Sequence, residues 1–287
     1  MDPIPADWAE RAARRVERRI AALPHWWSPL DRGMLLTART DFRERPLSAA
    51  FDVRVVDAAG TPRRVAVAGG AGRPLMILPG LYAALNEGLF AVLAELAAQR
   101  GRSVLLVEDR LAAGTLALTG GEVPSLQRIG LELAAIAGPL AAQPDVLALS
   151  AGAAAALAAP PGTFARIATW SGALDIWATA ENLAGHAMPR FHYAQVHKRA
   201  FHGAHLRAPP IATIPARLAA GAPCGLPPDP LLMVHAEDDP VVPPSVVAGL
   251  PLDDGQVVLV APAGAHLGFG TLVGPDIYLV PFDEEPG

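Results

Sequence analysis

A serine at the junction of an apolar run and an alanine-rich run is the first residue whose setting could support chemistry. Residues 147–149 read as a buried strand, Ser150 follows, and residues 151–159 read as a helix. A turn this tight needs small residues two before and two after the serine, where this chain has Ala148 and Gly152. A serine that caps a buried helix gives the same local pattern, so Ser150 needs support from other segments.

The candidate acid follows a second buried strand. Residues 231–235 precede Ala-Glu-Asp-Asp, and the loop Pro-Val-Val-Pro comes directly after Asp239. We rank Asp239 first among the acids, Asp175, which follows an apolar strand at 166–170, second, and Asp238 third. A solvated acidic turn is the alternative interpretation of the segment.

The candidate base follows a third apolar strand. Residues 256–260 lead into Ala-Gly-Ala-His-Leu-Gly-Phe, in which the histidine is His266. A lone histidine is usually structural or solvated, so its context matters. A neutral imidazole can take the proton of a serine hydroxyl, and a buried carboxylate can hold the ring in the required tautomer. Ser150, His266 and Asp239 together would fill these three roles.

These three segments resemble those of the α/β-hydrolases. The family's nucleophile motif is Gly-x-Ser-x-Gly, and this chain departs from it where Ala148 replaces the first glycine. The acid loop and the small-small-His-x-Gly-Phe loop are similar, and the chain order serine, acid, histidine is that of the family and not of chymotrypsin or subtilisin. The resemblance covers about residues 50–270.

The resemblance implies a serine hydrolase that cleaves a small-molecule carboxylic ester or thioester through an acyl-serine intermediate, with no cofactor and no metal. It also implies an oxyanion hole formed by the backbone N–H of Ala151 and that of Leu81, although family members often have His-Gly where this chain has Pro79-Gly80. An acyltransferase or a carbon-carbon hydrolase would use the same triad. A non-catalytic binding protein on the same scaffold is the alternative from another class.

The elements that must position these residues are predicted by hydrophobic patterning. Apolar runs typical of strands buried on both faces alternate with helical patterns near 85–99 and 126–142. We therefore expect a three-layer α/β fold, with a mostly parallel sheet of seven or eight strands covered by helices on both faces. The expected strands are 75–78, 103–107, 145–149, 166–170, 231–235 and 256–260, after a hairpin over 51–56 and 64–68, with 276–280 as a candidate edge strand.

The same pattern divides the chain into three parts. Residues 1–49 contain an amphipathic helix over 6–22 and an irregular segment, and we expect them to pack on the core. Residues 50–170 and 231–287 form the α/β core. Residues 171–230 interrupt the alternation and are predicted to form a helical or irregular cap.

Composition argues against several classes of protein. A formal net charge of −5 and a pI near 5.9 do not resemble the basic footprint of a nucleic-acid-binding protein, so we expect no nucleic-acid partner. The single cysteine, Cys224, excludes an intrachain disulfide. The most apolar region is interrupted before it could span a bilayer, and the first residues lack the pattern of a signal peptide, so we expect a cytoplasmic protein with no membrane span.

The predicted cap carries positive charge without any carboxylate between residues 182 and 228. Its charges could favour substrates with an anionic group remote from the scissile bond, or they could pair with acids of the core. Its five histidines match no metal-binding spacing, so we expect no metal. The basic residues are Arg190, Lys198, Arg199, Arg207 and Arg217, and the histidines are His186, His192, His197, His202 and His205.

Overall fold

A computed structural model describes residues 3–21, 45–220, 225–269 and 273–283 of the chain. The irregular segment expected after the first helix lies largely outside the described residues, and so does Cys224. Within the described ranges, no helix combines the length and the apolar character needed to cross a bilayer.

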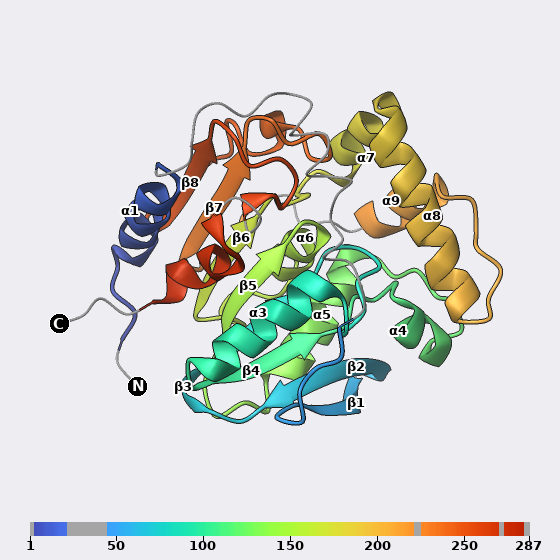
Figure 1. Cartoon of the computed structure of the whole chain (residues 1–287), viewed down its shortest axis with the longest axis horizontal. Coiled ribbons are helices and arrows are strands. Elements are labelled where there is room, and N and C mark those ends of the chain that lie inside the picture. The colour runs from blue at the N-terminus through green and yellow to red at the C-terminus, as the bar shows by residue number, and fades with distance from the viewer. Residues whose placement is uncertain (1–2, 22–44, 221–224, 270–272, 284–287) are drawn as a thin grey trace.

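Eight strands form one sheet in the order β1-β2-β4-β3-β5-β6-β7-β8. β1 and β2 form the expected antiparallel hairpin, β2 runs antiparallel to β4, and the remaining neighbours are parallel (Figure 1). The prediction of a mostly parallel sheet is confirmed. The strands are β1 (Asp52–Ala58), β2 (Thr61–Ala68), β3 (Ala71–Leu78), β4 (Arg102–Val107), β5 (Asp145–Leu149), β6 (Arg166–Trp170), β7 (Leu231–Ala236) and β8 (Gln256–Ala261).

The central strands are apolar on both sides because each face of the sheet is covered. Leu75 and Ile77 of β3 point into one hydrophobic core, whereas Met76 and Leu78 point into the other. The first core is closed by α1 (Trp8–Ile20), α3 (Gly88–Gln99) and η3 (Pro275–Phe282). The second is closed by α5 (Leu126–Ala137) and α6 (Ala151–Leu157), on the opposite face (Figure 1).

The amphipathic helix expected near the amino terminus is α1, and it packs on the core through its apolar stripe. Trp8 and Val16 are buried against β8 and η3. The indole Nε1 of Trp8 donates to the carbonyl oxygen of Pro281 at 3.1 Å, and its ring stacks on Phe282 with centroids 6.1 Å apart. Segments from the two ends of the chain therefore lie side by side (Figure 1).

The candidate edge strand at residues 276–280 is wrong, because these residues lie within the 3₁₀ helix η3. Pro275 suits the first turn of a helix, and Pro281 lacks the N–H that a strand ladder requires. Residues 277–280 are all buried, so they do not alternate between a covered and an open face. The apolar run closes the first core as a short helix instead.

The segment between β6 and β7 is helical and contains no strand within its described residues. It comprises α7 (Ile176–Gly185), α8 (Ala187–Gly203) and α9 (Thr213–Ala219), which we call the cap helices. α7 packs on α8 and α9, and α8 packs on α4 (Ala113–Leu118), a short helix that the sequence pattern does not reveal. The helix expected over 126–142 ends earlier, at Ala137, and Gly138 follows it.

Candidate active site

Ser150 lies at the turn between β5 and α6, as its sequence setting predicts. Its backbone has φ 54° and ψ −121°, a conformation that a residue with a side chain rarely adopts. Its N–H donates to the carbonyl oxygen of Trp170 at 2.9 Å, which holds the turn against β6. Backbone strain of this kind clusters at functional sites, where the surrounding structure imposes it.

The small residues around Ser150 have different tolerances. A Cβ at Gly152 would lie 2.5 Å from the carbonyl oxygens of both Leu78 and Pro79, so only glycine fits there. Ala148, which replaces the family's first glycine, is fully buried with its methyl group in the second core. The departure from the motif therefore falls at the position that has room for a methyl group.

His266 faces Ser150 from the loop after β8. Its Nε2 lies 3.0 Å from Ser150 Oγ. The loop is strained on both sides of the ring, with φ 45° at Ala265 and φ 59° at Leu267. Tyr278 of η3 holds it by donating its hydroxyl to the carbonyl oxygen of Leu267 at 2.7 Å.

Asp239 contacts the other ring nitrogen of the same histidine. His266 Nδ1 lies 3.0 Å from Asp239 Oδ2 and 3.2 Å from Oδ1, and Oδ1 also accepts from the N–H groups of Val241 and Val242 at 2.8 and 2.9 Å. Burial alone would raise the pKa of Asp239, but the nearby His266 and these hydrogen bonds outweigh burial and lower it. The carboxyl group therefore stays ionised where the imidazole needs a negative partner.

His235, which the sequence analysis does not single out, supports the same loop. Its Nε2 lies 3.0 Å from the carbonyl oxygen of Val242, and burial lowers the pKa of this fully buried histidine. It is thus a neutral ring that holds the loop carrying the acid. No local motif marks it, because a histidine inside a buried strand has many structural uses.

The other two candidate acids, Asp175 and Asp238, accept hydrogen bonds from backbone N–H groups elsewhere. Asp175 is exposed and caps α7, with its Oδ1 accepting from the N–H of Ala178 at 2.9 Å. Asp238 Oδ1 accepts from the N–H groups of Gly264 and Ala265 at 2.9 and 2.8 Å, so it braces the loop that carries the histidine. Of the three acids, the structure brings Asp239 to His266.

The two predicted oxyanion donors adjoin the serine. Ala151 is the first residue of α6, and Leu81 follows Gly80, where an added Cβ would lie 3.3 Å from the Cβ and 3.7 Å from the Oγ of Ser150. Neither the N–H of Ala151 nor that of Leu81 donates to another residue in the described ranges. Both donors are therefore available to an oxygen bound beside Ser150.

Asp109 and Tyr82 join this site although no motif points to them. Asp109, just past β4, accepts from the N–H of Tyr82 at 2.7 Å. The buried Tyr82 hydroxyl lies 2.8 Å from Nδ1 of His197 in α8, and its ring contacts Tyr193 edge-on. Burial raises the pKa of Asp109 to about 6, against the opposing effect of its hydrogen bonds and of Arg63.

The cap histidines do not gather into a metal site. His197 is buried between Tyr82 and the carbonyl oxygen of Pro209, which its Nε2 contacts at 2.9 Å. His186, His192, His202 and His205 are exposed. Across the described ranges, no group of three or more His, Cys, Asp or Glu side chains is arranged to hold a metal ion.

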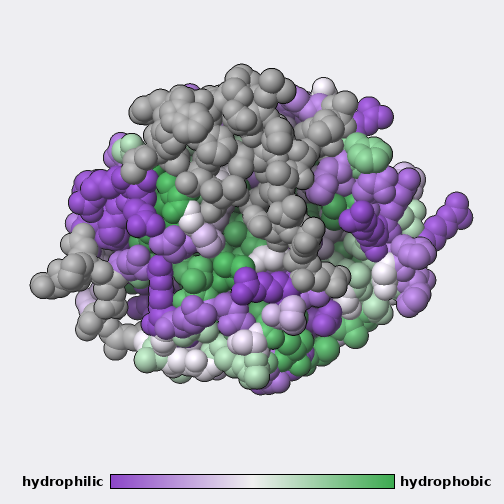
Figure 2. Space-filling model, viewed as in Figure 1, coloured by the Kyte–Doolittle hydropathy of each residue, from purple (hydrophilic) through white to green (hydrophobic). Residues whose placement is uncertain are grey.

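The cap cations remain on the surface. Arg190, Lys198, Arg199, Arg207 and Arg217 are exposed, and none of them pairs with a carboxylate in the described part of the chain. Lys198 and Arg207 line a surface cavity of about 490 Å³ together with Pro209 and Ile211. Hydrophilic side chains gather over the cap helices and over α1 on the face shown in Figure 2.

Comparisons with known proteins identify the fold. No family model and no curated protein matches the chain. Among solved structures, 2,6-dihydroxy-pseudo-oxynicotine hydrolase matches with a TM-score of 0.60 and 15% identity, over 96% of this chain and 84% of its own. The esterase Pf2001 of Pyrococcus furiosus matches with a TM-score of 0.57 and 13% identity, over 82% and 94% of the two chains.

A third solved structure is α/β-hydrolase domain-containing protein 10 from mouse, with a TM-score of 0.54 and 15% identity over 80% of this chain and 96% of that one. Structural similarity at such low identity shows a shared fold and does not identify the substrate. On that ground, the chain has the α/β-hydrolase fold.

Proposed function

We propose that this protein hydrolyses a carboxylic ester or thioester of a small molecule through an acyl-serine intermediate. One observation carries the proposal: a continuous line of contacts runs from Asp239 through His266 to Ser150, with 3.0 Å at His266 Nδ1 and 3.0 Å at Nε2. A serine needs such a base to become nucleophilic, and the base needs such an acid to hold its tautomer. The hydrolases and esterases among its structural neighbours are consistent with this activity.

Acylation follows from the direction of these contacts. Ser150 Oγ attacks the carbonyl carbon while its proton passes to His266 Nε2, and Asp239 stabilises the imidazolium that forms. The carbonyl oxygen becomes negative and accepts hydrogen bonds from the N–H groups of Ala151 and Leu81. When the carbon-oxygen or carbon-sulfur bond breaks, the proton on Nε2 goes to the departing alcohol or thiol.

Deacylation repeats these steps with water. The water oxygen attacks the acyl carbon and gives one proton to His266 Nε2, and the same two donors stabilise the second oxyanion. The bond to Ser150 Oγ then breaks, Oγ takes the proton back, and the carboxylic acid leaves. Every bond and proton is accounted for by the triad and water, so the proposal requires no cofactor.

A panel of substrates tests this function. p-Nitrophenyl esters of increasing chain length and matched thioesters should be hydrolysed by the wild-type protein. Ser150→Ala should lower kcat by about 10⁴-fold or more with the fold unchanged, because the nucleophile is lost. Adding an alcohol or thiol acceptor and measuring the new ester separates an acyltransferase from a hydrolase. Near wild-type hydrolysis by Ser150→Ala would contradict the proposal.

We further propose that the preferred substrate carries an anionic group remote from the scissile bond. The cap cations are exposed, and no carboxylate among the described residues forms an ion pair with them. They can therefore attract an anionic group of a substrate. Charges of this kind act through steering and weak pairing, which salt screens. The preference should therefore affect kcat/KM more than kcat.

A further inference from the structure

The loop that bears the second oxyanion donor contains a strained turn. We call residues 79–83 the oxyanion loop. Within it, the N–H of Ala83 donates to the carbonyl oxygen of Gly80 at 3.2 Å, and Tyr82, the third residue of the turn, has φ 68°. A positive φ at this position is typical of a type II turn, which favours glycine there. A tyrosine in that conformation persists only where its surroundings hold it.

The turn sets the direction of the proposed donor. The carbonyl oxygen of Gly80 and the N–H of Leu81 belong to the same peptide unit, which is planar. Holding the carbonyl oxygen through Ala83 therefore also fixes where the Leu81 N–H points. Any group that keeps the turn in place keeps this donor aimed beside Ser150.

Asp109 makes two of the contacts that keep the turn in place. Its Oδ1 accepts from the N–H of Tyr82 at 2.7 Å, and its own N–H donates to the carbonyl oxygen of Ala83 at 3.1 Å. The same Oδ1 accepts from the N–H of Leu111 at 3.0 Å, which ties the side chain to its own loop. We propose that Asp109 is a positioning residue that fixes the oxyanion loop for catalysis, an inference that rests on the proposed function.

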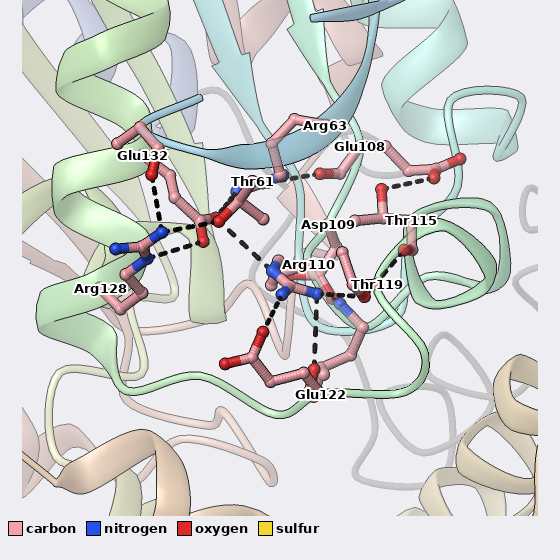
Figure 3. A network of polar contacts seen from close by, with 12 residues as sticks. Thr61, Arg63, Glu108, Asp109, Arg110, Thr115, Thr119, Glu122, Arg128 and Glu132 are labelled. Atoms are coloured by element: carbon pink, nitrogen blue, oxygen red, sulfur yellow. Dashed lines mark hydrogen bonds and ion pairs between the residues drawn. The ribbon is translucent and has the colours of Figure 1, made fainter. Parts of the chain in front are cut away.

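Buried ion pairs anchor the backbone on both sides of Asp109 (Figure 3). Arg63 donates to the carbonyl oxygen of Glu108 at 2.8 Å and to Glu132 Oε2 at 2.7 Å. Arg110, on the other side, lies 3.5 Å from the same Glu132 oxygen. All four of these charged side chains are at most 2% exposed.

Two further contacts hold the ends of this network. Glu108 Oε2 accepts from the hydroxyl of Thr115 at 2.8 Å, and Arg110 donates to the hydroxyl of Thr119 at 2.7 Å (Figure 3). Buried ion pairs often stabilise a protein no more than apolar packing would. Their effect here is geometric, because they fix the two peptides from which Asp109 reaches the oxyanion loop.

The role requires a hydrogen-bond acceptor and not a negative charge. Burial raises the pKa of Asp109 to about 6, and its side-chain Oδ1 can accept from the Tyr82 N–H whether or not the carboxyl group is ionised. Asparagine offers an acceptor oxygen in the same place. Alanine offers none, and glutamate keeps the charge but displaces the acceptor by one methylene group.

Amide hydrogen exchange of the oxyanion loop tests the positioning directly and needs no substrate. In Asp109→Ala, peptides that cover residues 79–84 should exchange at least ~10-fold faster than in the wild type, whereas Asp109→Asn should match the wild type. Asp229→Ala is the matched control, because Asp229 is also partly buried and accepts a backbone N–H, from Gly162 at 3.0 Å, near the amino end of β7. In Asp229→Ala, the amide exchange of the oxyanion loop should match that of the wild type.

Steady-state kinetics with a p-nitrophenyl ester test the catalytic consequence. Asp109→Ala should lower kcat by about 10²-fold with KM changed little, because the oxyanion forms only along the reaction and small displacements of such groups cost that much. The kcat of Asp109→Asn should stay within about threefold of the wild-type value. A trifluoromethyl ketone forms a tetrahedral adduct with the serine, and its inhibition constant should rise only in Asp109→Ala. Asp229→Ala should keep wild-type kcat.

Three results would overturn the inference. The first is wild-type loop exchange and wild-type kcat in Asp109→Ala. The second is a kcat of Asp109→Asn as low as that of Asp109→Ala. The third is a kcat of Asp109→Glu higher than that of Asp109→Asn. The last comparison decides the matter if the alanine variant does not fold. If the wild-type protein hydrolyses no ester or thioester, the proposed function fails, and hydrogen exchange still determines whether Asp109 holds the loop.

Discussion

The backbone of Gly152 passes so close to Leu78 that a Cβ on the glycine would lie 2.5 Å from the Leu78 carbonyl oxygen. This approach joins the start of α6 to the end of β3 and so brings Ser150 next to the oxyanion loop. Two backbones can pass at this distance only where one of them has no side chain.

Gly152→Ala should therefore destabilise the protein strongly, by on the order of 2–4 kcal/mol, because backbone must move to relieve the clash. Ala148→Gly, on the other side of Ser150, restores the family motif and should cost only about 1 kcal/mol. Urea unfolding of the two variants measures the difference. Equal stabilities would show that the approach at Gly152 is not what shapes the turn.

Asp239→Asn should lower kcat by about 10³–10⁴-fold, because an amide nitrogen facing His266 Nδ1 favours the wrong imidazole tautomer. Asp175→Asn and Asp238→Asn should have much smaller effects, since Asp175 caps a helix and an asparagine at 238 keeps the oxygen that accepts from Gly264 and Ala265. Ester hydrolysis by the three variants gives the ranking. If Asp175→Asn is the inactive variant, the catalytic acid is Asp175, which follows β6, and not Asp239.

The central strands could be predicted from the sequence because strands buried on both faces appear as continuous apolar runs, without polar residues between them. The three triad candidates could be predicted because each follows an apolar strand, although β8, at the edge of the sheet, is only partly buried. The structure of residues 276–280 could not be predicted in this way, because a short apolar run fits either an edge strand or a short helix. Their packing on α1 and α3 accompanies the 3₁₀ helix that they form.

The contribution of Asp109 could not be predicted for a different reason. Its contacts join two loops that are 27 positions apart in the chain, between Tyr82 and Asp109, and no spacing rule describes them. The cap helices were also not predicted in detail. α8 packs through Val196, Ala200 and Phe201, which have helical spacing, but histidines within this stripe and the exposed Phe191 outside it obscure the pattern in the sequence.

Stability should depend on pH through Asp109. Burial raises its pKa from 3.8 to about 6, so the stability that the neutral carboxyl group contributes is fully present below about pH 4 and is lost as pH rises through 6. Asp109→Asn cannot ionise, so its stability relative to wild type should increase from pH 4 to 7 by on the order of 2 kcal/mol, at about 1.4 kcal/mol per pKa unit. Urea unfolding across this range measures it, and a difference independent of pH would contradict the argument.

An ester with a distal carboxylate should be hydrolysed with a higher kcat/KM than its neutral analogue at low salt, and the advantage should shrink at high salt. Arg199→Ala and Arg207→Ala should reduce the preference, since both side chains line cavities beside α8. Arg18→Ala, which removes an exposed cation of α1 outside the cap, is the matched control. If the preference is absent at low salt, or if it persists in both Arg199→Ala and Arg207→Ala, the proposed preference for an anionic substrate is wrong.

The central claim is that Ser150 is a nucleophile activated by His266, whose Nε2 lies 3.0 Å from its Oγ. The most direct measurement is mass spectrometry of the protein after treatment with a fluorophosphonate, which reacts with activated serines. The account predicts one phosphonyl adduct on the peptide that contains Ser150, with no adduct in Ser150→Ala and much slower labelling in His266→Ala. A wild-type protein that stays unlabelled, or one labelled at another residue, would contradict it.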